Sequence, residues 1–79
     1  MKWLSASAMY DVLEEIASGW VKEQAKVQRY WCPVCIAKRL NQNPDQMQAA
    51  IDRLVGANIL ISSEFTVCAC GGRPVIRPN

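Results

Sequence analysis

An asparagine followed by proline in the middle of the chain separates two segments with helical periodicity. The apolar repeat stops at Asn41-Gln42-Asn43-Pro44. Asparagine is a preferred N-cap, and proline fits the first helical position because its missing N–H would have no partner there. We therefore predict that one helix ends near Leu40 and that another begins at Pro44, with a short turn between them.

The segments on both sides of this turn have the spacing of amphipathic helices. In the second segment we expect a helix that ends at Gly56 with a left-handed C-cap. Its buried face is predicted to consist of Met47, Ala50, Ile51, Leu54 and Val55. In the first segment Pro33 suits the first helical position, with Cys32 as the cap. The buried residues of this shorter helix are predicted to be Ile36, Ala37 and Leu40.

A third amphipathic segment lies nearer the start of the chain, with Ser5 or Ser7 as its predicted N-cap. Its apolar residues are Met9, Val12, Leu13, Ile16, Ala17 and Trp20, and the opposite side carries Asp11, Glu14 and Glu15. Gly19 is a natural stop, but good helix formers follow it up to Val27. The sequence therefore allows this helix to end either at Gly19 or near Val27.

The remaining segments favour β-structure. Residues 28–31 are short and aromatic and end before Pro33, as a short strand would. Residues 59–67 and 73–77 flank a glycine turn and predict a hairpin in which Cys68 alternates with Thr66 and Cys70 along one strand. The order is helix, short strand, helix, helix, hairpin. This predicts an α+β winged helix-turn-helix, and 79 residues allow one domain over 1–79.

The composition narrows the class of protein. A chain that is 51% hydrophobic and 20% charged is typical of a globular domain. The sequence has no run of about 18 apolar residues and no signal-peptide pattern, so we expect no membrane span and a cytoplasmic location. The net charge of +2 means that any basic patch has to be local. We find no catalytic motif and expect a protein that is not an enzyme.

The chain has four cysteines and no histidine. They form two close pairs: Cys32 and Cys35, then Cys68 and Cys70. Because the short strand and the last strand should run antiparallel, both pairs should meet in one place. Four thiolates can enclose zinc, and an iron–sulfur cluster is a less favoured occupant of the same ligands. Two other interpretations remain open: a dithiol redox motif at Cys32 and Cys35, and buried thiols without a metal.

A helix-turn-helix can place its second helix in the major groove of DNA. We therefore predict that double-stranded DNA is the partner, with phosphate and base contacts from Lys38, Arg39, Gln46, Gln48, Arg53, Arg73 and Arg77. Asp45 and Asp52 lie on or beside the same face and would repel phosphate. The alternatives are a solvated helix face without a ligand, and a module without direct DNA binding. Such a module would dock a protein partner or a second copy as a homodimer, or would act as a metal- or redox-responsive adaptor.

The run from Arg29 to Ile61, which contains Cys-Pro-Val-Cys and Asn-Gln-Asn-Pro, resembles bacterial winged-helix regulators. It is especially similar to the enterobacterial family that includes the carnitine-operon activator and activators of secretion loci. The segment from Ile36 to Glu64 is also similar to the small winged-helix proteins of ferrous-iron transport, which carry their cysteines in the wing. These resemblances imply a winged-helix fold and a regulatory role.

Overall fold

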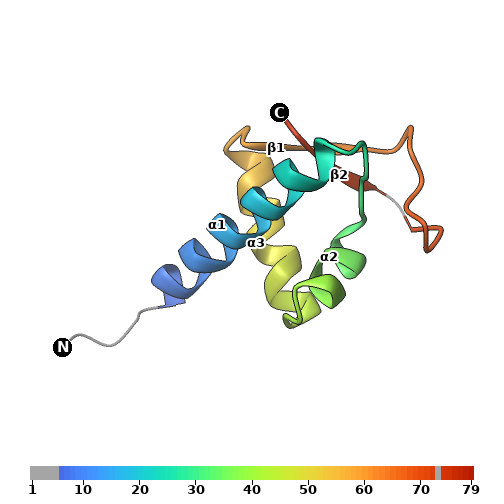
Figure 1. The fold of residues 1–79 in the computed structure, drawn as a ribbon. Coiled ribbons are helices and arrows are strands. Elements are labelled where there is room, and N and C mark those ends of the chain that lie inside the picture. The colour runs from blue at the N-terminus through green and yellow to red at the C-terminus, as the bar shows by residue number, and fades with distance from the viewer. Residues whose placement is uncertain (1–5, 73) are drawn as a thin grey trace.

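The computed structural model describes the backbone of residues 6–72 and 74–79, and the side chains from Asp11 onward except Arg73. Within these residues, three helices precede one small antiparallel sheet (Figure 1). The elements are α1 (Ala6–Ala25), α2 (Pro33–Arg39), α3 (Pro44–Gly56), β1 (Leu60–Ser63) and β2 (Val75–Pro78). The predicted α+β architecture of three helices and a hairpin is confirmed.

Helix α1 continues through Gly19 to Ala25, so the longer of the two predicted helices is the one that forms. It begins at Ala6, which places Ser7 inside the helix and not at its cap; Ser5 and the side chain of Met9 lie outside the described residues. The predicted strand over residues 28–31 is wrong except at Trp31, which forms a single antiparallel bridge to Ile76. The physical reason is Gln28, whose φ of 57° turns the backbone out of the extended conformation.

The turn between α2 and α3 has the predicted caps. Pro33 and Pro44 occupy the starts of their helices. The side-chain oxygen of Asn43 accepts hydrogen bonds from the backbone N–H groups of Asp45 and Gln46, at 2.9 and 3.1 Å. These bonds satisfy two of the N–H groups that a helix leaves without an internal partner.

Helix α3 ends at Gly56 as predicted, but Gly56 is not the left-handed residue. That conformation belongs to Asn58, with a φ of 62°, while Ala57 is the C-cap. The N–H of Asn58 bonds to the carbonyl of Val55, and the N–H of Ile59 bonds to that of Leu54. This is a Schellman motif with asparagine in the place that glycine usually takes.

The three helices and the sheet share one apolar core. Helix α1 packs on α3, α2 packs on α3, and β2 packs on α1. The buried members of this core are Leu13, Ala17, Val21, Ile36, Ala37, Met47, Ala50, Ile51, Leu54, Leu60 and Ile76. The predicted apolar faces of α2 and α3 are confirmed, with Leu40 and Val55 at the partly buried edge.

Strands β1 and β2 pair with Leu60 opposite Pro78 and Ser63 opposite Val75. The β1 strand ends at Ser63, so the prediction that Cys68 alternates with its neighbours along a strand is wrong. The chain instead turns at Cys68, where the N–H of Gly71 bonds to the carbonyl of Cys68 at 2.8 Å. We call residues 64–74 the cysteine connection. None of the described helices has the length and apolar character needed to cross a membrane.

Candidate metal centre

The fold brings all four cysteines together. Cys32 and Cys35 lie at the start of α2, and Cys68 and Cys70 come from the cysteine connection, drawn in orange beside the segment that leads into α2 (Figure 1). Their four Sγ atoms lie within 4.8 Å of one another. The bridge between Trp31 and Ile76 brings the two pairs to the same place, as the predicted antiparallel arrangement requires.

The spacing of the sulfurs fits one tetrahedral metal ion. Ligand sulfurs at about 2.3 Å from a central ion are about 3.8 Å from one another. The Sγ atoms of Cys32 and Cys70 are 3.5 Å apart, close to that separation and far longer than a disulfide bond. All four cysteines are free thiols. A four-iron cluster binds each thiolate to a different iron, which spreads the sulfurs more widely than four ligands on one ion.

The candidate centre has a buried side and an open side. Cys32 and Cys68 are only 4% and 3% exposed and pack with Val75, while Cys70 is exposed. Tyr30 and Trp31 cover the same cluster. Four protein ligands with a partly buried shell are typical of a structural site, which has no open coordination position for a substrate.

Gly72 is a residue of this centre that the sequence indicated only as part of a turn. A Cβ atom at this position would lie 3.0 Å from the Sγ of Cys32 and 3.1 Å from that of Cys70. Its backbone N–H donates a hydrogen bond to the Sγ of Cys70 at 3.3 Å. Gly72 therefore lets the backbone approach the sulfurs and orients one of them, and the only signal in the sequence was the Gly-Gly that follows Cys70.

The thiols differ in acidity. Burial raises the pKa of Cys32 and of Cys35, and hydrogen bonds to neighbouring sulfurs raise that of Cys35 further. Burial acts in the same direction on Cys68, but hydrogen bonds with the backbone of Cys70 and Cys32 and with nearby thiols outweigh it and lower its pKa to about 6. The grouping therefore shifts the pKa values of these thiols in opposite directions, and a metal bound there would displace the protons of Cys32 and Cys35.

The burial of Cys32, the first thiol of the Cys-x-x-Cys pair, is unlike a dithiol redox motif, whose nucleophilic thiol is partly exposed. In such motifs the first thiol is acidified at a helix N-terminus, which makes it the nucleophile. Here the first thiol, Cys32, is buried and its pKa is raised.

Of the residues predicted to contact DNA, those on α2 and the start of α3 face solvent. Lys38 and Arg39 are exposed, and the guanidinium of Arg39 also lies 4.7 Å from the ring centre of Trp31. Gln46 and Gln48 are exposed on α3. The amide of Gln48 donates a hydrogen bond to the carboxylate of Asp52 at 2.9 Å.

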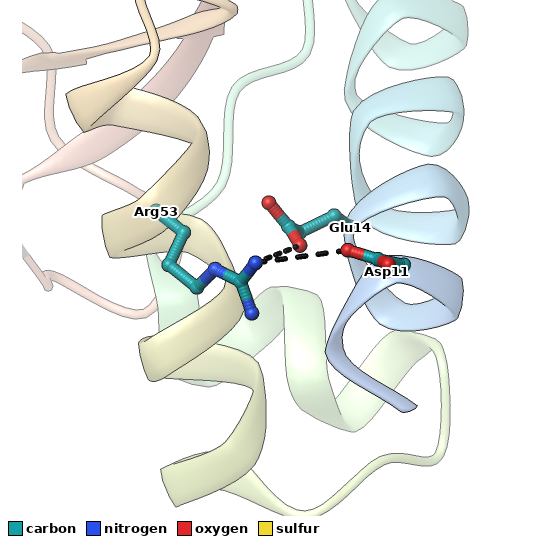
Figure 2. A network of polar contacts seen from close by, with 3 residues as sticks. All are labelled: Asp11, Glu14 and Arg53. Carbon is teal, nitrogen blue, oxygen red and sulfur yellow. Dashed lines mark ion pairs between the residues drawn. The ribbon is translucent and has the colours of Figure 1, made fainter. Parts of the chain in front are cut away.

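The other predicted cations have contacts within the chain or lie outside the described side chains. Arg53 reaches from α3 toward α1, where its guanidinium forms ion pairs with Asp11 at 3.6 Å and Glu14 at 3.5 Å (Figure 2). The guanidinium of Arg77 lies 4.8 Å from the ring centre of Tyr30. Arg73 lies outside the described residues. Of the described cations in this set, Arg53 and Arg77 are therefore engaged by other side chains of the protein.

Comparison of this chain with protein-family models, with curated proteins and with solved structures finds no match.

Proposed function

We propose that the four cysteine thiolates hold one zinc ion and that this ion is structural. The observation that carries the proposal is the gathering of all four Sγ atoms within 4.8 Å. Zinc favours four thiolates in tetrahedral geometry and has no redox chemistry, which suits a site whose task is to hold two segments together. The ion would fasten the cysteine connection to the start of α2.

We also propose that the zinc-bearing domain binds duplex DNA through α3. Helices α2 and α3 are joined by a short turn over residues 40–43, and the exposed residues near the start of α3 include Gln46 and Gln48. Glutamine can read adenine in the major groove, and Lys38 and Arg39 at the end of α2 can contact phosphates. The hairpin that follows would be the wing.

The charges of this surface set the expected strength of binding. Asp45 and Asp52 are exposed on α3, and the guanidinium of Arg53 is paired with carboxylates of α1. With about two or three cations directed at phosphates, the logarithm of the binding constant should fall with the logarithm of salt concentration with a slope of about −2 to −3. We expect weak binding that depends on salt.

Metal content tests the first proposal. Protein purified from medium without added metal should contain one zinc per chain, measured by elemental analysis and by native mass spectrometry. Cys70→Ser changes an exposed ligand and should lower zinc occupancy while circular dichroism shows that the helices remain. Thr66→Ala, an exposed change in the same connection, should retain zinc. Full-length protein that binds no zinc even when the metal is supplied would refute the proposal.

Fluorescence anisotropy with a labelled duplex at low salt tests the second proposal, that the domain binds DNA. Lys38→Glu should weaken binding by about tenfold through loss of one phosphate contact and repulsion by the new charge. Arg29→Glu makes a similar change at an exposed position before α2 and should have a smaller effect. The DNA proposal fails if the zinc-loaded protein shows no salt-dependent binding, or if the two variants weaken binding equally.

A further inference from the structure

The four cysteines of the candidate metal centre differ in their access to solvent. Cys32 and Cys68 are buried together against Val75, and Cys35 is half-buried. Cys70 is the exposed member of the group. A small reagent dissolved in water therefore meets Cys70 before it meets the two buried cysteines.

The cysteine ligands can be oxidised even though zinc itself has no redox chemistry. A peroxide converts an accessible cysteine to a sulfenic acid, which condenses with a second thiol to form a disulfide. At Cys70 the second sulfur is already in place, because the Sγ of Cys32 lies 3.5 Å away. Cys70 belongs to the cysteine connection, outside the helices and strands, so a short movement there can bring the two sulfurs to bonding distance.

Cys32 and Cys70 come from different segments of the chain, which sets this pair apart from the two pairs that are close in sequence. Cys32 is the N-cap of α2, and Cys70 lies in the cysteine connection. A disulfide within either close pair, Cys32 with Cys35 or Cys68 with Cys70, would leave the connection unattached once the metal was lost. A disulfide between Cys32 and Cys70 would keep the connection attached to α2 by a covalent bond.

We propose that Cys70 is an oxidation site through which a peroxide releases the zinc, with Cys32 as the second sulfur. The inference rests on the proposed zinc site and concerns its regulation. The Cys70 thiolate attacks one peroxide oxygen, the O–O bond breaks and hydroxide leaves, so that Cys70 becomes a sulfenic acid. The Cys32 thiolate then attacks that sulfur, the S–O bond breaks and a second hydroxide leaves.

This sequence balances and removes half of the ligands. The two thiolates lose two electrons to the peroxide, and the two hydroxides take up two protons from the buffer and become water. Cys35 and Cys68 remain as the only thiolates of the group, and two ligands do not enclose a zinc ion that is held by four in a structural site. Reduction of the disulfide by an external thiol would restore all four ligands.

Zinc release and disulfide mapping on the zinc-loaded full chain test the proposal. The zinc content of the reduced protein is measured first, so that failure of the zinc proposal is recognised before any oxidant is added. Hydrogen peroxide should then release one zinc for each disulfide formed, which a chromophoric zinc indicator follows. Trypsin places Cys32 and Cys70 in different peptides, residues 30–38 and 54–79. Mass spectrometry should find these peptides joined, with the bond between Cys32 and Cys70.

Cys70→His keeps a zinc ligand but removes the exposed sulfur, so this variant should bind zinc and release it to peroxide at least about tenfold more slowly than the wild type. Cys35→His is the matched control, because it makes the same exchange at a half-buried ligand. It should release zinc at nearly the wild-type rate and still form the cross-link.

The outcomes separate the two proposals. Reduced protein that binds no zinc would refute the zinc site and this inference with it. Zinc-loaded protein that keeps its metal in excess peroxide would overturn this inference alone. The same holds if zinc is lost while the two tryptic peptides stay separate, or if Cys70→His releases zinc as fast as the wild type.

Discussion

The three helices and the cysteine connection are built on different forces. The helices share a continuous apolar core in which Ile36, Met47 and Ile51 are fully buried. In the cysteine connection Phe65 is fully exposed and Val67 is largely exposed, and only Cys68 is buried among the described residues. The three helices, which we call the helical body, can be held by hydrophobic burial, whereas the connection buries little of its apolar surface, so the proposed metal site would have to hold it in place.

The proposed zinc ion would join these two regions. The backbone bonds at the tip of the connection, between Cys68 and Gly71 and between Cys68 and Gly72, are local and do not reach the helices. The Sγ contact between Cys70 and Cys32 does cross from the connection to the start of α2. An ion bound there would therefore join the weaker region to the stronger one, and its free energy of binding would contribute to folding.

Removal of zinc should have the largest effect and should separate the two regions. On chelation we expect the amide protons of Cys68, Gly71 and Gly72 to exchange at least about 100-fold faster, corresponding to a loss of about 2.7 kcal/mol or more of local stability. The amides in the middle of α3 should retain most of their protection. Hydrogen exchange measured by NMR distinguishes these outcomes, and complete loss of helix on chelation would show that the body cannot fold alone.

Ile51→Ala weakens the core of the three helices and leaves the four metal ligands unchanged. The side chain is 1% exposed in the core, so its truncation should destabilise the protein by about 2 to 5 kcal/mol through lost burial and a cavity. Chemical denaturation of the zinc-loaded protein measures this change. The zinc stoichiometry of the folded fraction should remain that of the wild type, and loss of zinc from folded protein would mean that the two regions are not separable.

Gly72→Ala should act on the metal centre with little effect on the body. The added Cβ would crowd the sulfurs of Cys32 and Cys70, so we expect zinc affinity to fall by about 10- to 100-fold. Competition with a chromophoric chelator measures this change. Gly56→Ala serves as the control and should leave affinity unaltered. Equal affinity for wild type and Gly72→Ala would contradict the close approach of this backbone to the site.

Asn43→Ala should have the smallest effect. It removes the oxygen that accepts two backbone N–H bonds at the start of α3, and loss of such a cap costs about 1 kcal/mol. Thermal denaturation of the zinc-loaded protein should detect the change. Asn43→Ser retains a capping oxygen and should recover most of the stability. If serine is no better than alanine, the cap does not contribute as described.

The parts of this molecule that the sequence predicted well depend on local capping or on the order of the elements along the chain. The start of α3 depends on Asn43 and Pro44 alone, and the gathering of the cysteines followed from the antiparallel order of the segments that carry them. The C-cap of α3 was predicted less accurately than the end of the helix. Asparagine competes with glycine for the left-handed position, and Asn58 adopts that conformation in place of Gly56.

The contacts that the sequence did not predict depend on packing between distant segments. Arg53 was expected to face DNA, and it pairs with Asp11 and Glu14 because α1 lies beside α3 (Figure 2). The close approach of Gly72 to the sulfurs likewise appears only when the connection lies against Cys32 at the start of α2. Helical periodicity gives the face of a residue on its own helix but does not identify the element beside it.

X-ray absorption at the zinc edge of the zinc-loaded protein tests the proposed four-cysteine site most directly. Four thiolate ligands on one zinc ion should give a single shell of four sulfur atoms at about 2.3 Å from the metal, with no metal neighbour. Cys70→Ser should lose one sulfur from that shell or lose the metal. A first shell in the wild type that contains oxygen or nitrogen in place of one or more sulfurs would contradict a site made by Cys32, Cys35, Cys68 and Cys70.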